Sequence, residues 1–457
     1  MPVAAAKGAL SSHFDGLLMT GQWLAGQSGL IAAVSGGPDS LALALVAAEV
    51  CAEASVRFEA VVIDHGLRDN STAEAQQVVA ALTSRKIAAR YFTVSGPAPL
   101  TGKQAWAREK RLQILCDYAR QNASAVLFAH HRDDQAETVM MRLSRGSGLT
   151  GLSAIAPYSL YQGVVFGRPF LGLSKEELIS VCQAYGADFV TDPSNADPVF
   201  ERVRTRQWLQ RPEQKQMLQQ MIRLAAASSG VASRVREECE RWCAEHAVFT
   251  HRLCAEIDRH AFLSLRGEAR RHMLRHCLAI IGSQPYPVSA QTLDMVLDRL
   301  MAGHKSTAGG CLIQMTKTRL RLIAEFGRPP EPALKVLADR LYVFDRRWLV
   351  YVPQDGVIRR LGAQGWAARD RQHPVFERAK TWPARVGMML PYLDGLDGQH
   401  YHPHFKSYPV VCSAAGRAAA QDSKLQGQDF VICDLPPDGA LTLTKGLSMT
   451  ESKGEGA

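Results

Sequence analysis

A glycine turn with a hydroxyl group at each end stands near the beginning of the chain. The segment Ser35-Gly-Gly-Pro-Asp-Ser40 directly follows an apolar run at residues 30–34 and directly precedes a helical pattern. Glycines let a ligand approach the backbone closely, and the free amides at the start of a helix attract anions. The turn therefore predicts a phosphate site formed by Ser35, Gly36, Gly37, Pro38, Asp39 and Ser40.

Asp39 is the unusual member of this turn. A carboxylate repels a phosphate unless a cation lies between the two groups. Magnesium prefers oxygen ligands and binds through one or two carboxylates together with substrate phosphates. We therefore expect Asp39 to be a magnesium ligand with a part in catalysis. The alternative is an ordinary aspartate at the start of a helix.

A second polar segment, His130-His-Arg-Asp-Asp-Gln-Ala-Glu-Thr138, follows another apolar run. His130, Asp134 and Glu137 would share one face of a helix that extended back to residue 130. In α/β proteins ligands bind at the carboxyl ends of the strands, where this segment would lie. The three side chains are candidate catalytic groups that could hold magnesium, orient an amine or accept its proton. The sequence leaves these roles open, and the alternative is a solvated helix start.

The scaffold of these segments is indicated by residues 29–200. Apolar runs at residues 30–34, 60–64, 89–94 and 125–129 alternate with helical windows such as 39–53 and 73–86. This alternation is typical of a parallel sheet covered by helices. Ser174 and Glu177 have the spacing of a helix capping box. We predict an α/β catalytic domain over residues 1–212.

The composition changes after this region. Residues 213–300 are rich in helix-forming types, and short aromatic and β-branched segments follow the proline-rich stretch that begins at Gly327. We predict a helical, arginine-rich domain at 213–328 and a small mixed α/β domain with strands at 329–457.

Charge and cysteine content limit the possible partners and location. The 457 residues carry a formal net charge of +9, which favours a polyanionic partner, and arginine recurs throughout residues 202–275. No window approaches 18 apolar residues and the first residues lack a secretory apolar segment, so we expect a cytoplasmic protein without a membrane partner. The ten cysteines include no CxxC pair, which argues against a disulfide framework or a structural zinc site.

Several motifs resemble those of a known enzyme family. The turn at 35–40 resembles the SGGxDS loop of the PP-loop ATP pyrophosphatases, whose Rossmann-like domain is of the adenine nucleotide α-hydrolase type. Residues 130–153 resemble the HHxxDQxET and RGSGxxGL pattern of the bacterial tRNA(Ile)-lysidine synthetases. The segments 62–68, 168–169 and 192–195, with the arginines at 202 and 206, match the same family.

This resemblance implies ATP and magnesium as cofactors, with free lysine and the CAU-anticodon isoleucine tRNA as substrates. The implied reaction adenylates the wobble cytidine, and the lysine ε-amine then displaces AMP. The C-terminal region would bind the tRNA body. The resemblance also assigns candidate residues: Asp64 and His65 beside the nucleotide, Arg108 with Arg111 for charge compensation in catalysis, and Arg202 and Arg206 for RNA contact.

Two other interpretations remain to be compared. A tRNA cytidine 2-thiolating enzyme shares the loop and part of the 130–138 segment, but such enzymes hold an iron-sulfur cluster through a CxxC pair that this chain lacks. A basic RNA-binding protein without catalysis would have no need of Asp39, His130, Asp134 and Glu137. Both are weaker than the ligase interpretation.

Overall fold

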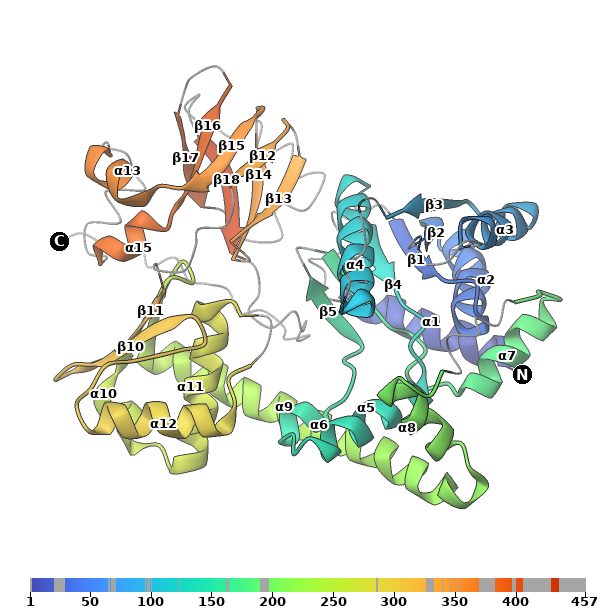
Figure 1. Ribbon diagram of the computed structural model, residues 1–457, viewed down its shortest axis with the longest axis horizontal. Helices are drawn as coiled ribbons and strands as arrows, with labels where there is room; N and C mark the ends of the chain where they lie inside the picture. The colour runs from blue at the N-terminus through green and yellow to red at the C-terminus, as the bar shows by residue number, and fades with distance from the viewer. Residues whose placement is uncertain are drawn as a thin grey trace.

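Three β-sheets, each with its own helices, make up the described part of the chain (Figure 1). The computed structural model describes residues 2–19, 29–64, 66, 71–94, 96, 99, 101–122, 124–161, 164–189, 197–284, 287–325, 333–338, 340–345, 347–352, 354–369, 383–396, 400–405 and 429–434. His65 and the segment 192–195, both singled out from the sequence, lie outside these residues.

The first sheet is the parallel sheet that the apolar runs predicted. Its order is β3-β2-β1-β4-β6-β5, and β5 is its one antiparallel strand. The strands are β1 (Gly29–Val34), β2 (Arg57–Asp64), β3 (Ala89–Thr93), β4 (Ser124–Leu127), β5 (Tyr158–Tyr161) and β6 (Val164–Gly167). Because β1 lies at the centre, the turn at 35–40 leaves the carboxyl edge of the sheet at its middle, and the expected α/β class is confirmed.

Helices cover both faces of this sheet. Along β1, Leu30, Ala32 and Val34 pack in one core cluster, and Ile31 packs in the cluster on the opposite face, as the two-residue repeat of a strand requires. The first cluster includes residues of α1 (Pro2–Met19), α2 (Pro38–Glu53), α3 (Ser71–Ser84) and α7 (Lys175–Ala184). The second includes residues of α4 (Lys103–Gln121).

A separate group of helices lies beside the carboxyl edge of the sheet. It comprises α5 (Arg132–Ser144), α6 (Leu149–Leu152), α8 (Glu201–Leu209) and the 32-residue α9 (Lys215–His246), with the short 3₁₀ turn η2 (Pro212–Gln214) between the last two. Ala136, Val139, Leu209 and Met221 share a core in this group. Figure 1 shows α9 running from this group toward the second sheet.

The second region contains a sheet in addition to the helices that its composition predicted. It holds α10 (Arg259–Ser264), α11 (Gly267–Gly282) and α12 (Ala290–Met301), and also a five-stranded antiparallel sheet of order β7-β8-β11-β10-β9. These strands are β7 (Ala247–Thr250), β8 (Cys254–Asp258), β9 (Ser306–Ala308), β10 (Cys311–Met315) and β11 (Arg319–Ala324). The expectation of a helical domain was therefore incomplete.

The described residues of the third region form strands, as expected, together with two short helices. Its sheet has the order β12-β15-β16-β17-β18-β14-β13. The elements are β12 (Leu334–Val336), β13 (Arg340–Phe344), β14 (Trp348–Val352), β15 (Gly356–Arg360), α13 (Gly362–Ala368), α15 (Ala384–Met388), β16 (Pro391–Gly395), β17 (His400–Phe405) and β18 (Asp429–Asp434). The buried Arg347 joins it to the second region by donating to the Ile281 carbonyl at 2.9 Å.

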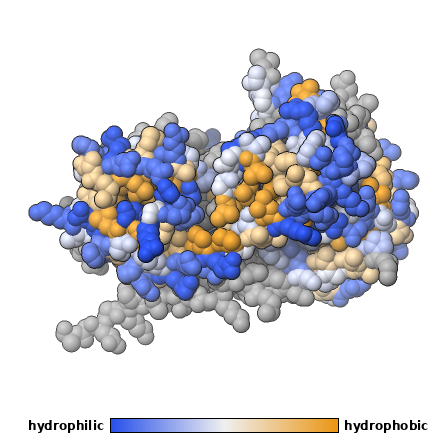
Figure 2. All heavy atoms as spheres, turned by 90° about the horizontal axis from the view of Figure 1, so that it is seen from below, coloured by the Kyte–Doolittle hydropathy of each residue, from blue (hydrophilic) through white to orange (hydrophobic). Residues whose placement is uncertain are grey.

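The visible surface is mostly polar. On the face shown in Figure 2, hydrophilic side chains predominate and hydrophobic ones gather in smaller patches. Among the described residues, the search for a helix with the length and apolar character needed to cross a bilayer found none.

Candidate active site at the carboxyl edge of the parallel sheet

The turn after β1 is held in shape by its own hydroxyl groups. The Ser35 amide donates to Ser40 Oγ at 3.1 Å, and Ser40 Oγ donates to the Gly37 carbonyl at 3.1 Å. Gly36 has a φ of 82°, and a Cβ there would lie 2.8 Å from Val78 Cγ2. Only glycine fits this position. The turn therefore presents the amino end of α2 at the carboxyl edge of the sheet, as a phosphate site requires.

Asp39 lies in the first turn of α2 with one carboxylate oxygen unsatisfied. Its Oδ1 is buried and has no hydrogen-bond partner among the described residues. Burial raises the pKa of Asp39, while His131 and Lys175 favour its charged form. A buried, unpartnered carboxylate oxygen beside an anion site suits a cation. No cluster of three His, Cys, Asp or Glu side chains suited to a metal was found among the described residues. Magnesium commonly binds through one or two carboxylates together with substrate phosphates and water.

The helix of the second segment begins later than its spacing suggested. The first residue of α5 is Arg132 and its N-cap is His131, so His130 precedes the helix and does not share its face. The His131 amide donates to Asp134 Oδ2 at 3.0 Å, which satisfies a donor at the helix start. Capping by Asp134 explains why the helix does not extend back to His130.

His131, rather than His130, connects the two segments. Its side chain is buried, and its Nε2 lies 3.5 Å from Asp134 Oδ2 and 3.8 Å from Asp39 Oδ2. The imidazole therefore stands between a carboxylate of the turn and a carboxylate of α5. His131 could not be preferred over His130 from the sequence, because both residues follow the same strand.

His130 faces a group of arginines. Its pKa falls to about 3, mainly because the ring is buried and also because Arg168, Arg202 and Arg108 are near, although Asp134 acts in the opposite direction. The ring is therefore neutral at physiological pH, with its Nδ1 buried and unpartnered among the described residues. A base with so low a pKa accepts protons poorly.

Two of the neighbouring arginines also have unsatisfied buried donors. Arg168 donates to the Ala156 carbonyl at 2.9 Å and to Ser159 Oγ at 3.0 Å, but its Nε and the Nε of Arg111 have no partner among the described residues. Burial, and then the charge of Arg108, lowers the pKa of Arg168 to about 10 and lowers that of Arg111. Buried guanidinium groups with an unsatisfied Nε suit an anionic ligand.

Glu137 and Asp134 are bound by the two arginines that the sequence analysis assigned to RNA. Arg202 Nε lies 2.8 Å from Glu137 Oε2 and its Nη2 lies 2.6 Å from Asp134 Oδ1. Arg206 Nε lies 2.6 Å from Glu137 Oε1. Burial alone would raise the pKa of Asp134, but His131, Arg202 and His130 hold it below its ordinary value. These ion pairs join α8 to α5.

The carboxylate of Asp64 accepts hydrogen bonds from residues that follow it closely in the chain. It is buried, its Oδ1 accepts from the Gly66 amide at 2.9 Å, and its Oδ2 accepts from Thr72 Oγ1 at 2.6 Å. Asp64 therefore shapes the connection from β2 to α3, at the same edge of the sheet as the glycine turn.

The sequence of the chain is similar to that of a known family. Residues 10–213 match the model of the PP-loop domain. The tRNA(Ile)-lysidine synthase of Rhodopseudomonas palustris is 36% identical over 312 residues, which cover 64% of this chain and 90% of that protein. The enzyme of the same name from Ruegeria pomeroyi is 33% identical over 340 residues, or 73% of this chain and 79% of that protein.

The chain belongs to the tRNA(Ile)-lysidine synthase family. Membership makes it an ATP-using ligase that forms a C–N bond, with magnesium as the usual partner of the nucleotide. The expectations of family, enzyme class and cofactors are confirmed.

The candidate site of this chain contains one further cation that the sequence analysis missed. Lys175 is the first residue of α7, its amide donates to Asp133 Oδ2 at 3.2 Å, and its ammonium is near enough to favour the charged form of Asp39. Cys182 of α7 lies 3.2 Å from the Pro38 carbonyl, so α7 packs against the start of α2. The capping box of Ser174 and Glu177, which the sequence predicted, fixes where α7 begins.

Proposed function

We propose that this member of the lysidine synthase family joins the ε-amine of free lysine to the wobble cytidine of the CAU-anticodon isoleucine tRNA. ATP first adenylates the ring carbonyl oxygen of the base and pyrophosphate leaves; the amine then displaces AMP. The observation that carries the proposal is the convergence, at one edge of the sheet, of the turn at 35–40, the unsatisfied Oδ1 of Asp39 and the buried arginines that have an unsatisfied Nε.

The ATP end of the site is assigned to the glycine turn and its neighbours. The amides at the start of α2 would hold the β- and γ-phosphates, and Asp39 would hold magnesium against them. The cation supplies charge neutralisation on the phosphates. Lys175 would approach from the start of α7 and balance the negative charge that pyrophosphate gains as it leaves.

The acceptor end is assigned to the arginine group around His130. Arg111 and Arg168 have unsatisfied donors that suit the α-phosphate of ATP and of the adenylated base, and the exposed Arg108 lies close to both. His130 is neutral, so it would serve as a hydrogen-bonding partner of the nucleotide or base rather than as the proton acceptor.

The lysine end is assigned to the ion pairs between α5 and α8. Arg202 is the more exposed cation, with 38% of its side chain accessible, and it stands against the buried carboxylates of Asp134 and Glu137. One accessible cation beside two anions fits the α-carboxylate and α-ammonium of a free amino acid. His131 and Asp134 would then fix the position of this end of the site relative to Asp39.

The test uses purified protein, ATP, magnesium, lysine and a CAU-anticodon tRNA transcript. Nuclease digestion and mass spectrometry should detect cytidine carrying lysine, together with AMP and pyrophosphate in equal amounts. A transcript with guanosine at the wobble position is the control and should remain unmodified. Unchanged cytidine in the cognate transcript, under conditions where the protein binds it, would refute the proposal.

A further inference from the structure

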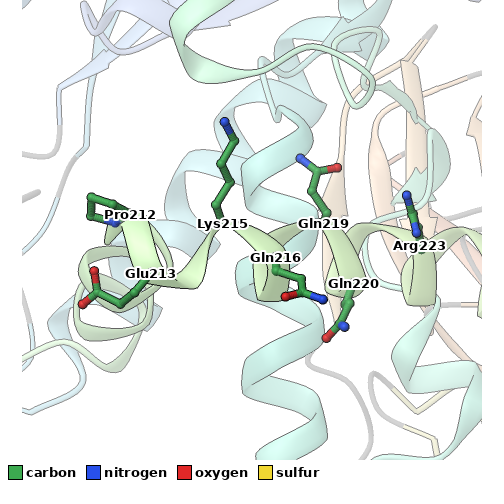
Figure 3. A pocket seen from close by; sticks show the side chains of 7 residues that line it. All are labelled: Pro212, Glu213, Lys215, Gln216, Gln219, Gln220 and Arg223. Atoms are coloured by element: carbon green, nitrogen blue, oxygen red, sulfur yellow. The ribbon is translucent and has the colours of Figure 1, made fainter.

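The first turns of α9 form a groove outside the active site, lined mainly by residues with charged or amide side chains. It has a volume of about 580 Å³ and is lined by Pro212, Glu213, Lys215, Gln216, Gln219, Gln220 and Arg223. Figure 3 shows Lys215, Gln219 and Arg223 on one side of the helix and Gln216 and Gln220 on the other. Both rows have four-residue spacing, so the groove runs between two ridges of the helix.

The side chains of these ridges are free to bind a ligand. Among the described residues, no hydrogen bond or ion pair holds the side chains of Lys215, Gln216, Gln219, Gln220 or Arg223, and all five are exposed. The apolar face of the same helix, which includes Met221 and Ala225, packs against α5 and α6. One face of α9 therefore packs against other helices, and the other face is free to bind a ligand.

Several other arginines of the 202–275 stretch are less available. Arg202 and Arg206 bind Glu137, and Arg252 is buried and donates to the Ile280 carbonyl. Arg271 is paired with Glu268 and Asp294. RNA contact along the whole arginine-rich stretch is therefore not expected, and the groove is a continuous part of the stretch whose basic side chains are exposed.

The chemistry of the groove favours a nucleic-acid backbone over a protein. From residue 214 to residue 236 the chain has basic side chains and no Asp or Glu, and Glu213 stands at the end of the groove. Lysine, arginine and glutamine are the side chains that bind phosphate and sugar oxygens. A protein interface needs aromatic or large apolar anchors at its centre, and the lining offers only Pro212.

We propose that this groove binds the sugar-phosphate backbone of the tRNA substrate. This inference rests on the proposed function. Lys215 and Arg223 neutralise phosphates, and the glutamines bond to phosphate and ribose oxygens without reading sequence. The groove begins six residues after Arg206, so a single RNA with its wobble base in the active site can continue onto α9, which is about 48 Å long.

The experiment measures binding of the CAU-anticodon isoleucine tRNA transcript at several salt concentrations. Lys215→Ala with Arg223→Ala should weaken binding about tenfold at 0.15 M salt and lower the slope of log affinity against log salt by about 1.5 to 2. Gln216→Ala with Gln220→Ala should weaken binding without changing the slope, because no charge is removed. Lys86→Ala, which removes an exposed charge elsewhere on the parallel-sheet unit, is the control and should change neither.

Lysidine formation in a single turnover at saturating tRNA separates this inference from the proposed function. The double charge variant should then react at nearly the wild-type rate. A wild-type salt slope in that variant would overturn the groove inference, whether or not lysidine forms. A different pair of results would separate the two proposals the other way. If the double charge variant binds tRNA weakly and the wild-type protein makes no lysidine, the groove still binds tRNA but the proposed reaction is refuted.

Discussion

Glu137→Gln distinguishes an anchoring carboxylate from a catalytic one. Three hydrogen bonds reach this carboxylate: Arg202 Nε to Oε2 at 2.8 Å, Arg206 Nε to Oε1 at 2.6 Å and Arg206 Nη2 to Oε2 at 3.1 Å. Glutamine keeps the shape but places an NH₂ group against one guanidinium donor. One bond is lost and the other two lose their charged acceptor.

The size of the destabilisation caused by Glu137→Gln follows from the burial of Glu137 and its arginine partners. A hydrogen bond to a charged group contributes about 1.5–3 kcal/mol and a neutral one about 1 kcal/mol. Because Glu137 is 98% buried but Arg202 reaches solvent, part of the loss is recovered by water, and we expect about 2 kcal/mol of destabilisation where α5 meets α8. This loss corresponds to a roughly thirtyfold larger equilibrium constant for local opening of α5 and α8.

Native-state hydrogen exchange of the amides in α5 and α8 measures this opening. Glu201→Gln is the matched control: Glu201 is on α8 and pairs with Arg145 directly after α5, but both side chains are exposed, so the expected loss is below about 0.5 kcal/mol. Exchange in β1 should not change in either variant. Unchanged exchange in α5 and α8 of Glu137→Gln, with transfer of lysine abolished, would refute the anchoring role and favour direct chemistry.

Three further outcomes are expected. Asp39→Asn should abolish pyrophosphate release at saturating magnesium while leaving the thermal unfolding midpoint unchanged, and near wild-type release would refute its metal role. Lys175→Met should raise the KM for ATP about tenfold in steady-state assays, and Lys175→Arg should have nearly the wild-type KM. An unchanged KM in Lys175→Met would contradict the contact of Lys175 with phosphate. His13 has its pKa lowered from 6.5 to about 4, chiefly by burial, so between those pH values the unfolded chain binds a proton that the folded chain does not. Stability should fall by about 3 kcal/mol from pH 6.5 to pH 4 in wild type relative to His13→Phe, measured by urea unfolding, and parallel pH profiles would contradict this.

The sequence predicted the elements whose signals are local. The apolar runs matched β1, β2 and β4 because helices bury these strands on both faces, and a run also matched the more exposed edge strand β3. The glycine turn was predicted because its composition and its position before a helix agree. The capping box at Ser174 was predicted for the same reason, since its partner is three residues away.

Contacts between distant residues could not be predicted in this way. The pairing of Arg202 with Glu137 joins residues 65 positions apart, so the sequence showed only four charged side chains and not their mutual neutralisation. The helix start at Arg132 depended on Asp134 capping the His131 amide instead of supporting another turn. The strands β7 and β8 were missed because they are short and lie in a stretch whose composition favours helices.

The order of the two chemical steps is the most direct test of whether ATP activates the tRNA base. With ATP, magnesium and the cognate tRNA but no lysine, the protein should release about one pyrophosphate per active site and accumulate adenylated RNA, and omission of tRNA should leave little release. This order is expected because the turn at 35–40 is assigned to the ATP phosphates, whereas the lysine is assigned to the separate ion pairs of α5 and α8. Rapid pyrophosphate release from lysine and ATP alone, with lysyl-adenylate detected by mass spectrometry, would contradict activation of the base.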